Sequence, residues 1–302
     1  DGSPQAGLEL AENECLGGTN GEEVYQRGAD GIRIPGSTVT NVAAQDGGSI
    51  KLSINADLQW FSQQVLAKRV TETGAQWGIV VVQEVKTGKL ITVADYPTVD
   101  PNDVNGSDES ARGSRAFSAP YEPGSTIKAL TAAGLINSGA AEPNTQVVAP
   151  YVINFPNEAR VRDAVPHGAM QLSLTGVLQE SSNTGITQLG QALDVKTRYD
   201  YFRAFGFGET SAVNFPGESG GILHPYEEWD NQTTYNTMFG QGLATTAIQV
   251  AGAYQTIGNG GVHLPASLVD ECVGPNGEVT KAEVPKGVQV VSPEAARTTV
   301  DM

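Results

Sequence analysis

The pattern of apolar and polar positions along the chain changes near Ser49. Residues 1–49 are polar and rich in glycine, and they carry no apolar pattern long enough to build a core of their own. Two short pieces within them, residues 7–10 and 31–35, have the composition of short strands. We therefore expect this segment to be part of a small β-rich module, or an extension that packs on the rest of the chain.

A strand and a long helix are predicted directly after this change. Residues 50–54 alternate between apolar and polar side chains, as a half-buried strand does. Asn55 and Asp57 then offer side-chain caps for a helix that runs to about Val70. The apolar side chains that we expect on the buried face of this helix are Leu58, Phe61, Val65 and Leu66.

A β-hairpin and a long loop follow the helix. Residues 78–85 and 89–94 are rich in β-branched residues, and the Lys-Thr-Gly triplet at 86–88 between them supplies a glycine for the turn. Residues 95–119 are rich in Pro, Asn, Gly and Ser, and they predict a long loop of a kind that is often functional or mobile.

The remainder of the chain is predicted to be mainly helical, with strands near its end. Helices are expected where apolar residues recur at helical spacing next to capping residues. These stretches are residues 125–138, 172–193 with an interruption at 181–183, 197–205, 245–258 and 293–302. Strands are predicted at residues 262–273 and 278–284, on either side of a Pro-Asn-Gly turn at 275–277.

The charge of the chain excludes one broad class of partner. The 302 residues include 34 Asp and Glu against 18 Lys and Arg, which gives a formal charge of −16. Phosphate backbones repel such a protein, so we expect no binding of nucleic acid. No stretch approaches the ~18 apolar residues of a membrane-spanning helix. The sequence also predicts neither a cofactor nor a metal site.

The cysteines and histidines do not form a recognisable catalytic pattern. Cys15 and Cys272 are far apart in the sequence, and although they could pair, the simpler interpretation is two unrelated small buried residues. His167, His224 and His263 are scattered, and nothing near them in the sequence forms a Ser-His-Asp set. We predict that they are ordinary surface or core residues.

The most informative chemistry lies in Ser125 and Lys128, at the beginning of a predicted helix. Two residues that are three positions apart on a helix lie on the same face. A serine hydroxyl is a weak nucleophile until a base takes its proton, and a lysine can be that base when desolvation or a neighbouring cation lowers its pKa. A helix N-terminus also offers free backbone N–H groups to the oxyanion of an acyl transfer.

The motifs around this pair resemble those of the penicillin-binding proteins. A Tyr-Glu-Pro-Gly segment at 121–124 immediately precedes Ser125, and a Ser-Ser-Asn motif follows at 181–183. Ser-x-x-Lys followed by a serine-containing second motif is the order found in these enzymes. Further segments similar to class B members are residues 96–97, 205–208, 215–218, 239–243 and 246–249, and residues 7–10 are similar to the pedestal of division-type members.

The resemblance implies roles for four residues. Ser125 attacks the D-Ala-D-Ala amide of a peptidoglycan stem peptide and becomes an acyl-ester, while Lys128 accepts its proton. Ser181 passes a proton between Lys128 and the leaving amine. Asn183 hydrogen-bonds the substrate backbone and helps to hold Lys128. An amine of a second strand then resolves the ester and forms the cross-link, and β-lactams acylate Ser125 because they mimic the dipeptide.

One motif of the family does not occur where the resemblance requires it. A Lys-Thr-Gly triplet is expected on an edge strand beside the nucleophile, well after the Ser-x-Asn motif. The triplet at 86–88 precedes Ser125, and we interpret it as a plain hairpin turn. We therefore expect the sequence to be incomplete at its C-terminus, because without this motif the clamp for the substrate carboxylate and half of the oxyanion hole are missing.

The implied fold class is α+β, with a β-lactamase/transpeptidase-like antiparallel sheet flanked by helices. Residues 50–302 would form the transpeptidase domain, and residues 1–49 would be part of a β-rich, dimerisation-like pedestal. The implied function is a peptidoglycan D,D-transpeptidase of cell-wall synthesis, septal in the first instance, with a role in elongation and cell shape left open.

The resemblance also implies a location and partners. The protein would lie at the extracytoplasmic face of the bacterial cell membrane, held by an N-terminal span outside this chain. Its partners would be divisome membrane proteins and a glycosyltransferase. Two alternatives remain open: a D,D-carboxypeptidase or β-lactamase, and a non-catalytic β-lactam sensor or divisome scaffold.

Overall fold

The computed structural model describes residues 3–100, 102–283 and 286–302, and the chain divides into two compact units. The first unit comprises Asp1–Ser53 and Leu268–Glu283, and the second comprises Ile54–Ser267 and Val284–Met302. The chain thus returns to the first unit for one segment after building most of the second. Because these units are defined by contacts and not by activity, the assignment of a pedestal and a transpeptidase domain stays a prediction.

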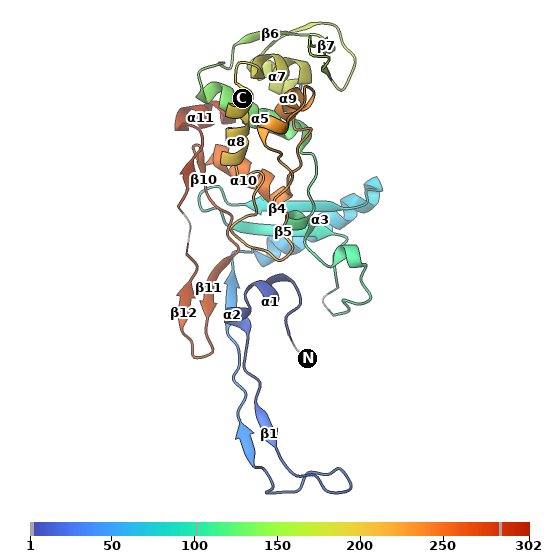
Figure 1. Cartoon of the computed structure of the whole chain (residues 1–302), viewed down its shortest axis with the longest axis vertical. Helices are drawn as coiled ribbons and strands as arrows, with labels where there is room; N and C mark the ends of the chain where they lie inside the picture. The colour runs from blue at the N-terminus through green and yellow to red at the C-terminus, as the bar shows by residue number, and fades with distance from the viewer. Residues whose placement is uncertain (1–2, 101, 284–285) are drawn as a thin grey trace. The chain divides into compact units, whose positions relative to one another are not determined.

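The first unit is built from short elements. Its helices and strands are α1 (Gly7–Ala11), α2 (Asn13–Leu16), β1 (Glu22–Val24), β2 (Thr40–Val42), β3 (Ser49–Leu52), β11 (Val269–Val273) and β12 (Val279–Lys281). Strands β1 and β2 pair in antiparallel fashion within a long two-stranded arm (Figure 1). Strand β11 lies between β3 and β12 in an antiparallel sheet of three strands.

Two of the three strands predicted within residues 1–54 are wrong. The strand expected at 50–54 is confirmed by β3. Residues 7–10 instead lie in helix α1, and residues 31–35 form turns around an isolated bridge between Arg27 and Arg33. None of these residues is buried. Their side chains therefore do not pack against a core in the alternating pattern from which the strands were predicted.

A disulfide joins Cys15 of α2 to Cys272 of β11 within the first unit. The two Cα atoms are 6.0 Å apart, a common separation for a disulfide. The interpretation of these cysteines as two unrelated residues is therefore wrong. The register of the sheet brings them together: Cys272 pairs with Ile50 of β3, and Gly48, just before β3, donates its N–H to the carbonyl oxygen of Cys15.

A helix and a hairpin begin the second unit. Helix α3 (Ala56–Thr73) starts at Asn55, whose side chain caps its first turn as predicted. Antiparallel strands β4 (Gly78–Gln83) and β5 (Leu90–Tyr96) confirm the predicted hairpin. Gly88 in the turn has a φ of +74°, a conformation that L-residues with a side chain rarely adopt.

The buried face of α3 differs from the predicted one. Leu66 and Val70 pack on the hairpin, whereas Phe61 and Val65 are 57% and 50% exposed. The helix approaches the sheet closely at Gly78, where a Cβ atom would lie 2.7 Å from both Leu66 and Val70. This close approach selects the Leu66–Val70 face, and it depends on a contact between elements that the helical period alone cannot specify.

Helix α5 (Ile127–Asn137) runs between two hydrophobic cores. Ile127, Leu130 and Ala133 join one core, and Ala132 and Leu135 join the other. The helices that supply the rest of these cores are α6 (Leu174–Gln179), α7 (Asn183–Gly190), α8 (Val195–Ala204), α10 (Ala247–Gly258) and α11 (Pro293–Asp301). The helices predicted in the second half of the sequence are thus confirmed to within a few residues.

Short elements complete the second unit. The predicted loop at 95–119 contains η1 (Glu109–Ala111) and α4 (Arg115–Ser118), and η2 (Gly124–Thr126) leads into α5. Antiparallel pairs join β6 (Gln146–Ala149) to β9 (Met170–Ser173), β7 (Val152–Asn154) to β8 (Arg160–Arg162), and β10 (Val262–His263) to β13 (Val288–Gln289). The remaining helical turns are η3 (Tyr226–Glu228), α9 (Thr233–Asn236) and η4 (Thr237–Phe239).

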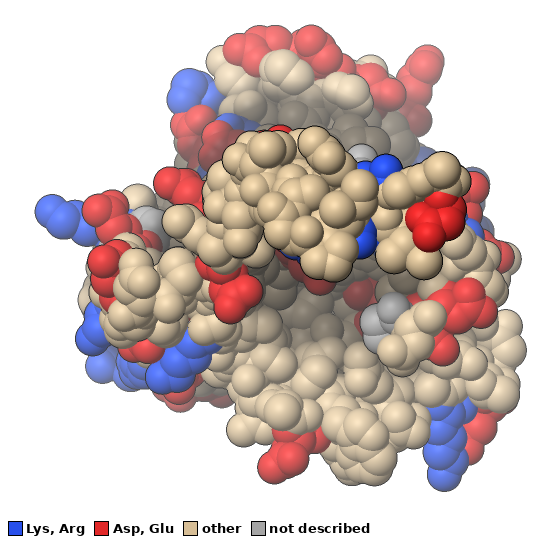
Figure 2. All heavy atoms as spheres, turned by 90° about the horizontal axis from the view of Figure 1, so that it is seen from below, with Lys and Arg blue, Asp and Glu red and all other residues tan. Residues whose placement is uncertain are grey.

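These elements confirm the predicted α+β class, since antiparallel strand pairs and helices occur together in the second unit. In the described part of the chain, none of the helices combines the length and the hydrophobicity that a membrane crossing requires. On the face drawn in Figure 2, basic side chains stand in small groups among acidic and uncharged ones.

Candidate active site

Ser125 and Lys128 meet at the start of the central helix. Ser125 lies in η2, two residues before α5 begins, and Lys128 lies in the first turn of α5. The lysine Nζ is 2.9 Å from the serine Oγ. Ser125 is exposed, whereas Lys128 is only 2% exposed. A reagent can therefore reach the hydroxyl while the amine behind it stays shielded from bulk water.

Ser181 completes a three-residue cluster. Lys128 Nζ lies 2.9 Å from Ser181 Oγ and donates to the Ser181 carbonyl oxygen at 2.5 Å. The amine thus contacts both serine hydroxyls, so that a proton can pass from Ser125 to Lys128 and from Lys128 to Ser181 without a large movement. The sequence predicted this meeting from the order of two motifs, and the structure brings the three side chains together.

Burial changes the proton affinity of the amine. Desolvation lowers the pKa of Lys128 from 10.5 to about 8, and the negative charge of Asp163 partly opposes this shift. Since each pKa unit is a factor of ten, the neutral fraction at pH 7 is about 300-fold larger than for an ordinary lysine. Lys128 is therefore poised to act as a base near neutral pH, as a general base must be.

The turn that carries Ser181 has a strained backbone conformation. Ser181 lies between α6 and α7 with a φ of +55°, which is unusual for a residue with a side chain. The following residue, Ser182, caps α7 by accepting the N–H of Gly185. A strained conformation of this kind persists only where neighbouring groups hold it in place. Here a buried carboxylate holds the residues that follow Ser181.

That carboxylate belongs to Asp163, which follows β8 and is 6% exposed. It accepts the hydroxyl of Ser182 at 2.8 Å and the backbone N–H of Thr184 at 2.9 Å. His167 Nε2 lies 2.9 Å from the same carboxylate. Because Asp163 stands between His167 and Ser182, the imidazole does not reach a hydroxyl, and these residues do not form a Ser-His-Asp triad.

Asn183 lies in the same turn but contacts a different group from the one expected. Its side-chain amide donates to the carbonyl oxygen of Arg162 at 2.9 Å. Among the residues that the structure describes, no hydrogen bond joins Asn183 to Lys128. Asn183 and Asp163 together tie the 181–184 turn to the end of β8, and Asn183 remains half-exposed beside the cluster.

The turn that carries Ser125 is held from the other side by the segment after η4. Gly124 donates its N–H to the Gly240 carbonyl oxygen at 2.9 Å, and the Glu122 carboxylate accepts the N–H of Gly242 at 2.8 Å. Gly240 has a φ of +80°, and a Cβ atom there would lie 2.1 Å from the Gly124 carbonyl oxygen. Glycine is thus required at 240 for the nucleophile's turn to adopt this position.

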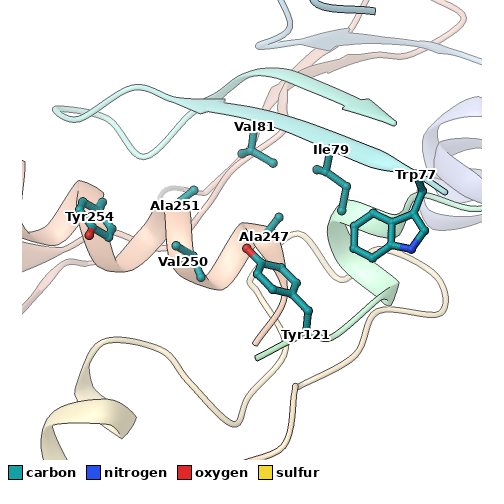
Figure 3. A pocket seen from close by; sticks show the side chains of 8 residues that line it. All are labelled: Trp77, Ile79, Val81, Tyr121, Ala247, Val250, Ala251 and Tyr254. Carbon is teal, nitrogen blue, oxygen red and sulfur yellow. The ribbon is translucent and has the colours of Figure 1, made fainter. Parts of the chain in front are cut away.

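An apolar pocket of about 380 Å³ adjoins this turn (Figure 3). Its walls come from β4 and the residue before it, from α10, and from the tyrosine two positions before Pro-Gly-Ser. They are Trp77, Ile79, Val81, Tyr121, Ala247, Val250, Ala251 and Tyr254. Burial raises the pKa of Tyr121 and that of Tyr254, so both hydroxyls stay protonated near neutral pH. The Tyr254 hydroxyl donates to the Thr126 carbonyl oxygen at 2.8 Å. The pocket therefore supports the nucleophile's turn without supplying a base.

The Lys-Thr-Gly triplet at 86–88 is the hairpin turn that the sequence predicted. Gly88 donates its N–H to the Glu84 carbonyl oxygen, and Lys86 Nζ lies 3.4 Å from Asn259 Oδ1. In the described ranges, neither Lys86 nor Thr87 contacts Ser125 or Lys128. The interpretation of this triplet as a plain turn is confirmed.

Several residues of the site were missed in the sequence. Asp163, Ser182 and Thr184 interact through a carboxylate that lies about twenty positions before the serine motif, and no spacing rule connects them. Gly240 was noted only as part of a similar segment, although its close contact with Gly124 gives it a structural role. The second serine of the Ser-Ser-Asn motif was the one visible signal, because a serine before a helical pattern is a capping residue.

Comparison with known proteins agrees with this arrangement. The penicillin binding protein transpeptidase domain family matches residues 78–302. Penicillin-binding protein PbpB of Mycolicibacterium smegmatis is 38% identical over 99% of this chain and 46% of its own length. A probable peptidoglycan D,D-transpeptidase, PenA of Neisseria flavescens, is 32% identical over 96% of this chain and 72% of the relative.

A solved structure agrees with the fold as well. Penicillin binding protein 3 of Mycobacterium tuberculosis, complexed with aztreonam, superimposes with a TM-score of 0.88 at 33% identity, over 99% of this chain and 63% of that chain. The chain belongs to the penicillin-binding protein transpeptidase family, and its relatives place it with the division-type class B members. It spans about half the length of the first curated relatives that it matches.

Proposed function

We propose that the protein is a peptidoglycan D,D-transpeptidase that works through an acyl-enzyme on Ser125. The observation that carries this proposal is the position of the Lys128 amine, 2.9 Å from the hydroxyl oxygens of both Ser125 and Ser181. The family, and the name of the PenA relative as a probable peptidoglycan D,D-transpeptidase, support the same reaction.

In the first half of the reaction, Ser125 Oγ attacks the carbonyl carbon of the D-Ala-D-Ala amide. Lys128 Nζ takes the hydroxyl proton as the new C–O bond forms, and the negative charge moves to the carbonyl oxygen. A helix N-terminus offers backbone N–H groups that can stabilise this oxygen. The C–N bond then breaks, the terminal D-Ala amine receives a proton from Lys128 through Ser181, and the acyl-ester remains on Ser125.

In the second half, an amino group of another stem peptide attacks the ester. It loses a proton to the Ser181–Lys128 pair, and Ser125 leaves with a proton returned from Lys128. Asn183 lies at the edge of this cluster and is half-exposed, which suits the proposed hydrogen bond to the substrate backbone. A β-lactam follows the first half alone, because its amide opens without releasing a separate leaving group.

A β-lactamase is disfavoured by the acidic groups around the site. Rapid hydrolysis of an acyl-enzyme requires a base for water, which in class A β-lactamases is a glutamate. Here two carboxylates beside the catalytic turns are engaged: Asp163 is buried and hydrogen-bonded to Ser182 and Thr184, and Glu122 accepts the N–H of Gly242. Among the described residues, no carboxylate contacts Ser125, and this supports a long-lived acyl-enzyme.

The place of action follows from the same proposal. Stem peptides lie outside the cytoplasm, so the protein would act at the extracytoplasmic face of the bacterial membrane. The similarity to division-type relatives supports a role in septal wall synthesis, together with divisome membrane proteins and a glycosyltransferase. These partners are part of the proposal and have no contact surface assigned in the structure.

Incubation of the full-length protein with a fluorescent penicillin tests the proposal. We expect covalent labelling that persists for many turnover times of a β-lactamase, and loss of labelling in Ser125→Ala. Ser118→Ala is the matched control, because Ser118 is exposed and seven positions away, and its hydroxyl donates to the Ser114 carbonyl oxygen. Absence of any adduct would favour a non-catalytic scaffold, and rapid loss of label would favour a β-lactamase.

A further inference from the structure

Both ring nitrogens of His167 face hydrogen-bond acceptors. Nε2 lies 2.9 Å from Asp163 Oδ2, and Nδ1 lies 2.5 Å from the Gly168 carbonyl oxygen. A neutral imidazole carries one N–H and can satisfy only one of these acceptors, whereas the imidazolium donates to both. The Gly168 carbonyl first, and then Asp163, therefore raise the pKa of His167 above its ordinary value. His167 therefore keeps its proton to a higher pH than an ordinary histidine does.

The same carboxylate oxygen connects His167 to the catalytic turn. Asp163 Oδ2 accepts from Ser182 as well as facing His167, and Oδ1 accepts the N–H of Thr184. Ser182 directly follows Ser181, whose carbonyl and hydroxyl oxygens contact Lys128. The path from the imidazole to the lysine amine therefore contains one carboxylate and one backbone turn.

The charges around this path are few. Lys128 is acted on by Asp163, which raises its pKa against the larger effect of burial. The negative charges of Asp163 and Glu180 also raise the pKa of His167. The rings of Tyr151 and His167 meet in an edge-on contact, with their centroids 5.9 Å apart. The charge state of His167 therefore decides whether the Asp163 carboxylate is compensated or acts on Lys128 alone.

We propose that His167 is a positioning residue that acts through Asp163, and that its protonation makes the Ser125–Lys128–Ser181 cluster more reactive. The imidazolium pairs with Asp163 and cancels most of its charge, so that Lys128 releases its proton more readily. After His167 loses its proton, the uncompensated carboxylate holds the proton on Lys128. The consequence for acylation rests on the proposed function, whereas the coupling between the two groups does not.

The sign of the effect separates this proposal from a merely structural role. In His167→Gln the side chain can still donate a hydrogen bond to Asp163 but cannot carry charge, so Lys128 experiences the full carboxylate at every pH. We expect penicillin acylation of His167→Gln to be slower by roughly two- to fivefold at about pH 6 and unchanged at about pH 9. Asp163→Asn removes the charge of the carboxylate. We expect the acid limb of its acylation profile to move to lower pH, whereas that of His167→Gln moves to higher pH.

Two measurements on the full-length protein test the coupling. The first is the second-order acylation rate against pH for the wild type, His167→Gln, Asp163→Asn and the control His224→Gln. His224 is a suitable control because it is exposed and its Nδ1 lies 3.7 Å from the carboxylate of the exposed Glu228. The second is an NMR titration of the His167 ring and of the Lys128 side chain in the wild type. We expect the Lys128 resonance to show a second inflection at the pH where His167 titrates.

The outcomes distinguish the two proposals. A His167→Gln profile equal to that of the wild type, or lowered equally at all pH values, overturns the role of His167 while leaving the transpeptidase assignment intact. If no variant is acylated, the proposed function fails, and the NMR titration alone decides the coupling. A wild-type Lys128 titration with one inflection, independent of His167, overturns the inference even if the variants do not fold.

Discussion

Replacing Lys128 by methionine tests the part of the mechanism that the structure defines most closely. Methionine keeps an unbranched apolar stem in a site where Lys128 is 2% exposed, and it removes the amine that contacts Ser125 and Ser181. General base catalysis contributes about 10²- to 10⁴-fold to a rate. We therefore expect acylation of Lys128→Met by penicillin to be slower by about that factor.

The pH dependence of acylation in the wild type tests quantitatively whether Lys128 is the base. With a pKa of about 8 for Lys128, about one molecule in ten carries the neutral amine at pH 7. The acylation rate should therefore rise with pH, level off above about pH 8, and be low and nearly flat in Lys128→Met. Stopped-flow mixing with a fluorescent penicillin over this pH range measures both profiles.

Stability is the control for this variant. Burial lowers the pKa of Lys128 in the folded state, so the folded protein binds fewer protons than the unfolded chain between pH about 8 and 10.5, and stability rises with pH through that window. Below pH about 8, burial of the charged ammonium destabilises the folded state, and replacement by methionine removes this destabilisation. Water can then hydrogen-bond the exposed hydroxyls of Ser125 and Ser181 in place of the ammonium. The midpoint of thermal unfolding of Lys128→Met at pH 7 should not fall. Acylation at nearly the wild-type rate by a folded variant would refute lysine as the base.

Two further variants test the contacts that support the fold. Gly240→Ala should lower stability by about 1–3 kcal/mol and slow acylation, because a Cβ atom would meet the Gly124 carbonyl oxygen and the backbone is left-handed; Gly113→Ala, where a Cβ meets nothing within 4 Å, should change neither. Removing the disulfide with Cys15→Ser and Cys272→Ser should lower the free energy of unfolding by about 2–5 kcal/mol. Denaturant unfolding measures each value, and wild-type stability in Gly240→Ala or in the cysteine variant would contradict the corresponding role.

Much of the secondary structure could be predicted because it is specified locally. The hairpin has a glycine at its turn, α3 begins at an asparagine cap, and α10 begins at Thr246, which forms a capping box with Gln249. These signals need only a few neighbouring residues. The Ser125–Lys128 contact is also specified locally, because two residues that are three positions apart in a helical turn lie on the same face.

The failures involve contacts between distant segments. The disulfide depends on the register of β11 against β3, and the buried face of α3 depends on the missing side chain at Gly78. The carboxylate of Asp163 reaches the serine motif through the path of β8, which no spacing in the sequence encodes. Residues 7–10 show another limit, because four residues, none of them buried, carry too little pattern to separate a strand from a helical turn.

The central claim is that the Ser125 hydroxyl is the nucleophile and that Lys128 activates it. The most direct measurement is mass spectrometry of the tryptic peptide 116–128 after the full-length protein has reacted with penicillin. The account predicts one penicilloyl group on this peptide, located by fragmentation at Ser125. In Lys128→Met, which removes the cleavage site after residue 128, the corresponding tryptic peptide 116–160 should acquire the group about 10²- to 10⁴-fold more slowly. An unmodified peptide, or an adduct at Ser118 or Thr126, would contradict it.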